Sequence, residues 1–347
     1  MQGGDQLGGG VRIAPDVSAE ECFRLARAMT LKNAAADLPY GGGKIVVYGD
    51  PKMPFEKKSQ LLRALAGALR YTEEYIFAPL TWGTDEICMA CIKDEIGRVV
   101  GLPCEMGGIP LDEVGATGWG LFNATEVALK YCDFELKGAR VVIQGFGAVG
   151  KHAARFLVRK GAVLVGVADS RGAVHNPEGL DVDSLIALKN EGKNVFEYPE
   201  GKKLASDEIV SVPCDIWIPA ARPDVINGNN VHLLDTKLVV EGANIPPLTG
   251  EAEKILYDKG ILYVPDFIAN AGGVICAASE HQKTTRSIVF GLIEEKVRSN
   301  TEQVLEASKT RGILPREAAF ELAIKRVNRA MKYRRWSIFS SAPPGFV

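Results

Sequence analysis

Six residues in the middle of the chain have the spacing of a loop that binds a dinucleotide. They are Gly145, Phe146, Gly147, Ala148, Val149 and Gly150. They follow an apolar run and begin a stretch with helical periodicity, which is the context that such a motif requires. In this motif Gly145 permits a tight turn, Gly147 lets backbone N–H groups approach a pyrophosphate, and Gly150 lets the helix pack against the strand. The phosphates would lie at the positive end of the helix dipole.

A carboxylate, Asp169, ends the next apolar run at about the distance from this loop that a dinucleotide site requires. Its two oxygens can accept hydrogen bonds from both hydroxyls of a ribose. Because a carboxylate repels a 2′-phosphate, Asp169 favours NAD as the cofactor. Arg171 could still accommodate a 2′-phosphate, so NADP is the alternative.

The elements around the loop predict an α/β fold with a doubly wound parallel sheet. Short apolar runs alternate with helical stretches or polar loops, as expected for strands that are buried on both faces. The runs cover residues 139–144, 162–168, 215–219, 238–241 and 261–264. This pattern is typical of a Rossmann dinucleotide-binding domain.

The residues before this region predict helices and one strand. Ser18 and Glu21 have the spacing of a capping box at the start of a mostly apolar helix that leads to Lys32. A glycine-rich turn at residues 40–44 then precedes a strand at residues 45–48. The other expected helices, the last of them interrupted at Gly312 and Pro315, cover residues 56–75, 85–98, 116–131 and 287–333.

The composition excludes several classes of protein. In 347 residues, 41 basic and 43 acidic side chains give a net charge of −2, which offers no excess charge for nucleic acid or a membrane surface. No stretch approaches the roughly 20 apolar residues of a membrane span, and the N-terminus lacks the basic and apolar parts of a signal peptide. Seven scattered cysteines indicate reduced thiols, so a cytoplasmic protein is expected.

No metal site is predicted. The four histidines share no common spacing along the chain. Cys88 and Cys91 form a single Cys-x-x-Cys pair within an expected helix, where cysteines usually act as small core residues.

Several motifs, in the same order along the chain, resemble those of the Glu/Leu/Phe/Val amino-acid dehydrogenases. They are Gly-Gly-Val-Arg at 9–12, Met-Thr-Leu-Lys at 29–32, Leu-Pro-Tyr-Gly-Gly-Gly-Lys at 38–44, the glycine loop at 145–150, Asp-Ser-Arg-Gly at 169–172, Asn-Pro-Glu-Gly-Leu-Asp at 176–181, Ile-Pro-Ala-Ala at 218–221, Glu-Gly-Ala-Asn at 241–244 and Asn-Ala-Gly-Gly-Val at 270–274. The resemblance extends from about residue 8 to about residue 335. The second half is most similar to the glutamate members, whereas residues 41–51 are more similar to the leucine members.

The resemblance implies a reaction and a domain organisation. The reaction is reversible oxidative deamination, in which a 2-amino acid, NAD(P)+ and water give a 2-oxo acid, ammonium and NAD(P)H. A substrate domain of the dimerisation type at residues 1–130 would precede a Rossmann domain at residues 131–285. C-terminal helices at residues 286–347 would pack back against the first domain. A homo-oligomer is expected, because the family forms hexamers or octamers.

The resemblance also implies roles in substrate binding and catalysis. Lys32 holds the substrate α-carboxylate as a point charge. Lys44 is the catalytic lysine, and its pKa should fall beside another cation and away from water, so that it can assist the attack of water on the iminium carbon. Gly42 and Ala277 border the substrate.

The cofactor site extends beyond the glycine loop and Asp169 in the family. By resemblance, Asn244 and Asn270 lie near the nicotinamide and its ribose, and Thr117 lies near the nicotinamide amide. The other residues implied at this site are Ser170, Ala220 and Ala221.

The chain departs from the family at the catalytic aspartate. The family motif is Ala/Gly-Pro-Asp-x-Gly-Thr-Asp, whereas residues 78–85 are Ala-Pro-Leu-Thr-Trp-Gly-Thr-Asp. Neither Leu80 nor Thr81, which precede Trp82, can transfer a proton near neutral pH, and Asp85 is expected to begin a helix. Three interpretations stay open. The chain is a catalytically impaired or regulatory homologue, another group transfers the proton, or compensating frame shifts in the recorded gene sequence have altered the motif.

Other departures concern the substrate and the assembly. Gly8 and Ala277 stand where glutamate enzymes have a lysine and a serine that bind the side-chain carboxylate of the substrate. Both changes favour a smaller or apolar amino acid over glutamate. Glu113 stands where the family often has an arginine, and this change has no functional account. Family members usually have several tens of residues before Gly8, so the short stretch here leaves the size of the assembly open.

Overall fold

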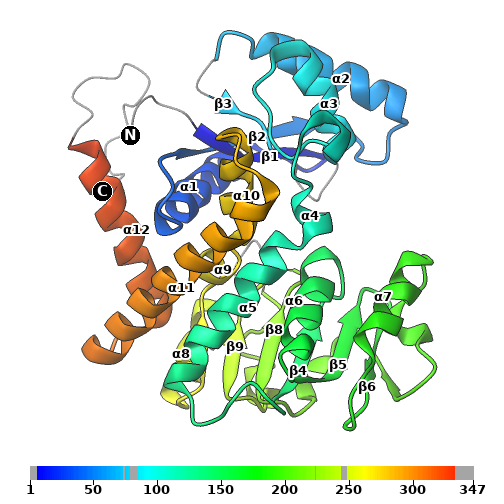
Figure 1. Cartoon of the computed structure of the whole chain (residues 1–347), viewed down its shortest axis with the longest axis vertical. Helices are drawn as coiled ribbons and strands as arrows, with labels where there is room; N and C mark the ends of the chain where they lie inside the picture. The colour runs from blue at the N-terminus through cyan, green and yellow to red at the C-terminus, as the bar shows by residue number, and fades with distance from the viewer. Residues whose placement is uncertain (1–5, 73–74, 79–83, 223, 244–247, 333–347) are drawn as a thin grey trace.

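Two sheets, one in each half of the molecule, organise the fold (Figure 1). The computed structural model describes residues 6–72, 75–78, 84–222, 224–243 and 248–332. A three-stranded sheet contains the first strands of the chain and a seven-stranded sheet contains the others. Figure 1 shows the smaller sheet at the top, the larger sheet below it, and helices running between the two. The expected α/β architecture in two parts is confirmed.

The smaller sheet is parallel, with the strand order β2-β1-β3. Its strands and the helices that follow them are β1 (Gln6–Ala14), α1 (Ala19–Ala35), β2 (Gly41–Tyr48), α2 (Phe55–Ala68), β3 (Tyr75–Ile76) and α3 (Glu86–Ile96). α2 ends earlier than the sequence predicts. The Arg98 guanidinium donates to the carbonyls of Leu69 and Thr72 at 3.0 and 3.2 Å, and these bonds hold the chain in a turn there.

The predicted glycine-rich turn at residues 40–44 is wrong, because β2 already begins at Gly41. The strand pairs with β1 along these glycines, with Leu7 opposite Gly42. A Cβ on Gly42 would lie 2.1 Å from the backbone nitrogen of Thr30 in α1. The missing side chain therefore serves close contact between strand and helix rather than a turn.

The predicted helix starts are confirmed, although one cap is only half formed. The Ser18 hydroxyl accepts a hydrogen bond from the Glu21 N–H at 3.1 Å, as in a capping box. The Glu21 carboxylate does not complete the box but forms an ion pair with Arg12 at 2.9 Å. At the start of α3, the Asp85 carboxylate accepts from the Cys88 N–H at 2.9 Å.

The larger sheet has the strand order β10-β9-β8-β4-β5-β6-β7. The five predicted strands are confirmed as β4 (Arg140–Gln144), β5 (Val163–Asp169), β8 (Ile216–Pro219), β9 (Leu238–Val240) and β10 (Leu262–Val264), which pair in parallel. Two further strands, β6 (Gly172–His175) and β7 (Lys202–Leu204), extend the sheet in antiparallel fashion. Their four and three residues are too short to show a period in the sequence.

Both faces of the larger sheet are buried, as the apolar runs predict. Val141 and Ile143 of β4 pack on one face, and Val142 packs on the other with Trp217 and Tyr263. The helices that precede the C-terminal region are α4 (Leu111–Val114), α5 (Ala116–Ala128), α6 (Ala148–Arg159), α7 (Val182–Asn190), α8 (Gly250–Asp258), α9 (Asp266–Ala269) and α10 (Gly272–His281). Among the described residues, no helix is both long enough and apolar enough to cross a membrane.

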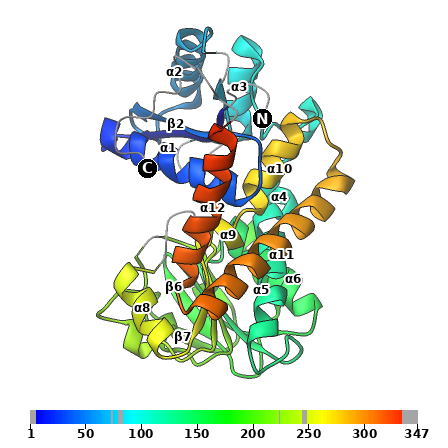
Figure 2. The same cartoon turned by 90° about the vertical axis from the view of Figure 1, so that its left-hand side faces the viewer.

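The C-terminal helices return to the first half of the molecule, as expected. α11 (Arg286–Arg311) and α12 (Pro315–Met331) are separated at Gly312, whose φ of 66° is left-handed. Arg326 of α12 donates to the carbonyls of Ala34 and Ala35 at 3.2 and 2.7 Å. Figure 2 shows α12 running from the larger sheet up to α1.

Replacement of Gly42 tests the contact between β2 and α1. We expect Gly42→Ala to destabilise the protein by about 1–3 kcal/mol, because the methyl group meets only backbone atoms and the strand must move. Gly67→Ala in α2 is the matched control: its Cβ meets nothing within 4 Å, so it should stabilise by about 0.5–1 kcal/mol. Urea unfolding followed by circular dichroism measures both. Equal stability of Gly42→Ala and the wild type would contradict the close contact.

Candidate active site

The glycine loop lies where the strand order of the larger sheet reverses. The chain passes from β4 to β5 on one side and reaches β8 on the other side of β4. In open α/β sheets the crevice beyond the carboxyl ends of such strands is the usual ligand site. Gly145 follows β4, and Ala220 and Ala221 follow β8; a Cβ on Gly145 would lie 2.7 Å from the Cβ of Ala221. Two predicted cofactor segments therefore touch each other.

The glycine loop has one closed side and one open side. The N–H groups of Gly145 and Phe146 both donate to the Ala168 carbonyl at 2.9 Å, and the Phe146 side chain is buried. A Cβ on Gly150 would lie 2.0 Å from the Gly145 carbonyl oxygen, so the helix packs tightly here. Gly147, by contrast, precedes α6 without a side-chain cap, and a Cβ on it would meet nothing within 4 Å. The open side is thus the N-terminus of α6, where anions are stabilised.

Asp169 is held by three hydrogen bonds. Its Oδ2 accepts from Lys189 Nζ at 2.8 Å and from the Val195 N–H at 2.9 Å, and its Oδ1 accepts from the Arg171 N–H at 3.0 Å. Burial acts to raise the pKa of Asp169, but these bonds outweigh burial and hold the pKa below its ordinary value. The carboxylate is therefore charged and oriented, while the neighbouring Ser170 is exposed.

Lys189 contacts a predicted cofactor residue and was missed by sequence reasoning. It lies on α7, 20 residues after Asp169, and its ammonium group partly neutralises the carboxylate. No motif marks it, since a lysine on a surface helix is common. Its contact with Asp169 becomes visible only in the folded structure, where α7 brings the lysine to the end of β5.

The segments with predicted contacts to the nicotinamide also meet. Asn270 is buried and its Nδ2 donates to the Ala243 carbonyl at 2.6 Å, which fixes the orientation of the amide. Thr117 lies in the first turn of α5, and a Cβ on Gly273 would lie 2.9 Å from its Oγ1. Asn244 lies outside the described residues.

The two predicted lysines come from neighbouring elements of the smaller sheet. Lys32 is in the last turn of α1 and Lys44 is in β2. The Asn33 side chain donates to the Gly41 carbonyl at 2.7 Å, and the Cys22 thiol donates to the Lys44 carbonyl at 3.3 Å. These bonds join the helix and the strand near both lysines.

Desolvation brings both lysines close to their point of deprotonation. Burial lowers the pKa of Lys32 to about 8, against the attraction of Asp266, which raises it. Burial also lowers the pKa of Lys44 to about 8, where Cys22 raises it and Arg12 and Lys32 lower it. The ordinary pKa of a lysine is about 10.4. Both lysines can therefore exchange protons at a pH much closer to neutral.

α10 connects the larger sheet with the first half of the molecule. The Glu280 carboxylate accepts from the N–H groups of Leu102 and Ile109 at 3.2 and 2.9 Å. At the end of the helix, Gln282 Nε2 donates to the Tyr40 hydroxyl at 3.3 Å. Ala277 is buried within this helix, which brings no polar group at that position.

The segment that departs from the family motif is mostly outside the described residues. Leu80, Thr81 and Trp82 all fall in the gap at 79–83. After the gap, the Thr84 hydroxyl is buried and donates to the Val11 carbonyl at 3.0 Å.

Asp112 is a second carboxylate of the region that sequence reasoning did not single out. Burial raises the pKa of Asp112, Glu86 raises it further, and Lys151 lowers it. Lys151 directly follows the glycine loop, so Asp112 lies close to the predicted cofactor site. The neighbouring Glu113 is exposed.

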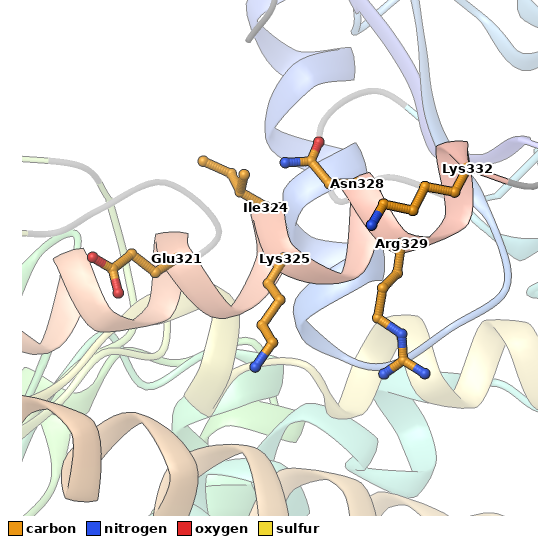
Figure 3. Close-up of a pocket in the computed structure, with 6 residues that line it drawn as sticks. All are labelled: Glu321, Ile324, Lys325, Asn328, Arg329 and Lys332. Atoms are coloured by element: carbon orange, nitrogen blue, oxygen red, sulfur yellow. The ribbon is translucent and has the colours of Figure 1, made fainter.

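A hollow of about 510 Å³ lies along α12. It is lined by Glu321, Ile324, Lys325, Asn328, Arg329 and Lys332 (Figure 3). Figure 3 shows Lys325 and Arg329 on one side of the helix and Ile324 and Asn328 on the other. None of the predicted site residues lines it, so the hollow is not the predicted active site.

Comparisons with known proteins connect this arrangement with a family. Residues 107–335 match the family described as Glutamate/Leucine/Phenylalanine/Valine dehydrogenase, and residues 5–98 match its dimerisation domain. A glutamate dehydrogenase of Aeropyrum pernix is 37% identical over 94% of this chain and 83% of its own length. An NAD-specific glutamate dehydrogenase of Staphylococcus aureus is 36% identical over 95% of this chain and 83% of its own. The crystal structure of a hetero-hexameric glutamate dehydrogenase from Thermus thermophilus, in a Leu-bound form, has a TM-score of 0.86 at 30% identity and covers 96% of this chain and 83% of its own.

Replacement of Asp169 tests the charge of this carboxylate. We expect Asp169→Asn to lower the free energy of unfolding by about 1.5–3 kcal/mol at neutral pH, because three donors lose a charged acceptor in a side chain that is 9% exposed. The folded pKa is depressed, so this stability is present above the unfolded pKa of about 3.9 and is lost as the pH falls through the folded pKa.

Urea unfolding of both proteins between about pH 7 and about pH 3 measures the difference. It should stay constant down to about pH 4 and then shrink. A difference that grows on acidification would contradict the depressed pKa.

Proposed function

Because this chain belongs to the Glu/Leu/Phe/Val dehydrogenase family, we propose that it catalyses the NAD(P)-dependent oxidative deamination of an L-amino acid. The amino acid, NAD(P)+ and water give a 2-oxo acid, ammonium, NAD(P)H and a proton. The observation that carries this proposal is the pair Lys32 and Lys44. Two desolvated lysines with pKa values of about 8 lie on adjoining elements of a chain that also has an open dinucleotide loop.

The two lysines have different proposed roles. Lys32 in its charged form binds the α-carboxylate of the amino acid as a point charge. Lys44 in its neutral form accepts a proton from water as the water attacks the iminium carbon. A bound nicotinamide supplies the acceptor for the hydride from the α-carbon. Gly42 precedes Lys44 by two residues in β2, where a side chain would meet the backbone of α1.

We propose NAD as the cofactor, with NADP as the alternative. The carboxylate of Asp169 is charged and oriented, which suits a ribose diol and disfavours a 2′-phosphate. One relative, from Staphylococcus aureus, is named as NAD-specific. Lys189 provides positive charge beside Asp169, and it supports the alternative, as does the presence of Arg171 two residues after Asp169 in the sequence. Glycine-loop residues, with Ala148 and Val149 at the start of α6, would hold the pyrophosphate.

We propose an apolar amino acid as the substrate. Ala277 is buried on α10 and has no polar group for a substrate carboxylate. Gly8 pairs with Gly43 in the β1–β2 ladder and likewise has no side chain. By resemblance, glutamate enzymes bind the side-chain carboxylate of the substrate with a lysine and a serine at these two positions. A charged substrate side chain would lack both partners here, and an unpaired buried charge is costly.

The alternative of a silent regulatory homologue is not favoured. Its support is the stretch Leu80-Thr81-Trp82, which replaces the family's aspartate. The relatives from Aeropyrum pernix and Staphylococcus aureus are named as dehydrogenases, and the lysines and the glycine loop are both present. Asp112 is a candidate for another group that transfers the proton, because burial raises its pKa and Lys151, which follows the glycine loop, acts on it.

Assembly and organisation follow the family in this proposal. Residues 5–98 match a dimerisation domain, and the Thermus thermophilus structure is described as a hetero-hexamer, so we propose an oligomer of six or eight copies of this chain in the cytoplasm.

We propose domain boundaries at residues 1–130, 131–285 and 286–347. Each half then contains one sheet, and α11 and α12 connect them.

A spectrophotometric screen tests the activity. Purified protein is mixed with NAD or NADP and with leucine, valine, phenylalanine, alanine or glutamate, and NAD(P)H formation is followed. We expect turnover with NAD and an apolar amino acid, and little with glutamate. A folded preparation that binds NADH but turns over none of these substrates would contradict the proposed activity and support the silent homologue.

The pH dependence tests the two lysines. Lys44 must be neutral and Lys32 charged, so kcat/KM for deamination should rise and then fall around a pH of about 8. Lys44→Ala should lower kcat about 10²- to 10⁴-fold, whereas Lys32→Met should mainly raise the KM for the amino acid. Lys52→Ala, an exposed lysine beyond β2, is the control. A profile without a titration near this pH would refute the assigned roles.

A further inference from the structure

Arg316, at the start of α12, is a buried cation surrounded by carboxylates. Its Nη2 donates to Glu241 at 2.6 Å, its Nη1 donates to Asp266 at 2.7 Å, and its Nε donates to Glu253. The guanidinium is 13% exposed, and the three acids are 0%, 7% and 3% exposed. Each nitrogen group of one planar fork therefore contacts a carboxylate from a different segment of the larger sheet region.

Two of these carboxylates stand directly before proposed cofactor residues. Glu241 follows β9 and precedes Gly242 and Ala243, after which comes Asn244 in the sequence. Asp266 begins α9, which leads to Asn270. The third carboxylate, Glu253, lies on α8 and leads to no proposed site residue.

The two cofactor segments are tied to each other at both ends. The Asp266 N–H donates to the same Glu241 oxygen that contacts Arg316, at 2.8 Å. At the other end, Asn270 Nδ2 donates to the Ala243 carbonyl at 2.6 Å. Ala243 in turn donates its N–H to the Pro219 carbonyl at 3.0 Å, beside the loop that touches Gly145. A movement of Arg316 would therefore change the spacing of the loops on β8, β9 and β10.

Asp266 also connects this cluster with the substrate half. Its charge raises the pKa of Lys32 against the effect of desolvation. Lys32 in turn is one of the charges that lower the pKa of Lys44. Arg316 and Lys32 thus share one carboxylate, and Arg316 helps to fix where that carboxylate lies.

We propose that Arg316 is a positioning residue for the nicotinamide half of the cofactor site. Its fork sets the distance between the 241–243 and 266–270 segments, and through them the orientation of the amide of Asn270. This inference rests on the proposed function, because it assumes that a dinucleotide binds at the carboxyl ends of these strands. Among the described residues, the bonds of the Asp169 carboxylate go to Lys189, Val195 and Arg171 and not to the cluster, so we expect the adenine half to bind ligands independently of Arg316.

Two ligands separate the halves of the site. NADH contacts both halves, whereas ADP contains only the adenosine and the pyrophosphate. Arg316→Lys keeps the charge but loses the planar fork, and Arg316→Met loses both. For both variants we expect NADH binding, followed by fluorescence on the folded protein, to weaken by about tenfold or more, and kcat to fall by up to about 100-fold. The dissociation constant of ADP, followed by calorimetry, should stay within about twofold of wild type.

Glu253→Gln is the matched control within the same cluster. It removes the charge of the carboxylate that leads to no proposed cofactor residue and keeps the contacts of Arg316 with Asp266 and Glu241, so it should lower the melting temperature but leave NADH binding near the wild-type value. If neither Arg316 variant folds, Glu241→Gln takes their place, because it keeps an acceptor oxygen for the Asp266 N–H and removes the charge that faces Arg316. For it we expect weaker NADH binding with unchanged ADP binding.

The outcomes distinguish the inference from the proposed function. If the wild type binds neither NADH nor ADP, the proposed cofactor site is wrong and the inference falls with it. If the wild type binds both, the inference is overturned by variants that lose stability alone, or that lose NADH and ADP binding equally. Selective loss of NADH binding, with Glu253→Gln near wild type, supports it.

Discussion

Desolvation of charge is the constraint on which the candidate site depends. A cation removed from water is destabilised by several kcal/mol unless carboxylates or ligands compensate it. Lys32 and Lys44 are compensated only in part, so burial lowers their pKa values to about 8. Arg316 is compensated by three carboxylates, and its pKa stays well above its ordinary value despite burial. The same physical effect thus gives two cations that exchange protons and one that holds its charge and geometry.

Local patterns were enough to predict the five parallel strands of the larger sheet and its glycine loop. Strands buried on both faces have continuous apolar runs, and each run ends at a turn that needs glycine or a polar residue. Gly145 and Gly150 have distinct backbone requirements, a positive φ at the first and a close contact at the second. These requirements act over a few residues, so the sequence expresses them directly.

Contacts between distant segments could not be predicted in the same way. Gly41 to Gly43 have the composition of a turn, yet pairing with β1 makes them a strand. Lys189 contacts Asp169 across 20 residues, and Arg316 contacts its carboxylates across 50 to 75 residues. No period or spacing relates such positions, because only the packed fold brings them together. The resemblance to the family supplied Lys32 and Lys44, which no local pattern marks.

The return of α12 to α1 has a consequence for the order in which the chain folds. Arg326 joins positions that are 292 and 291 residues apart when it donates to Ala34 and Ala35. During synthesis, the strands of the larger sheet can pair before the last helix has left the ribosome, whereas α1 cannot yet be covered. Contacts of such long range also form slowly. The half of the molecule that the ribosome makes first is therefore the half that completes its packing last.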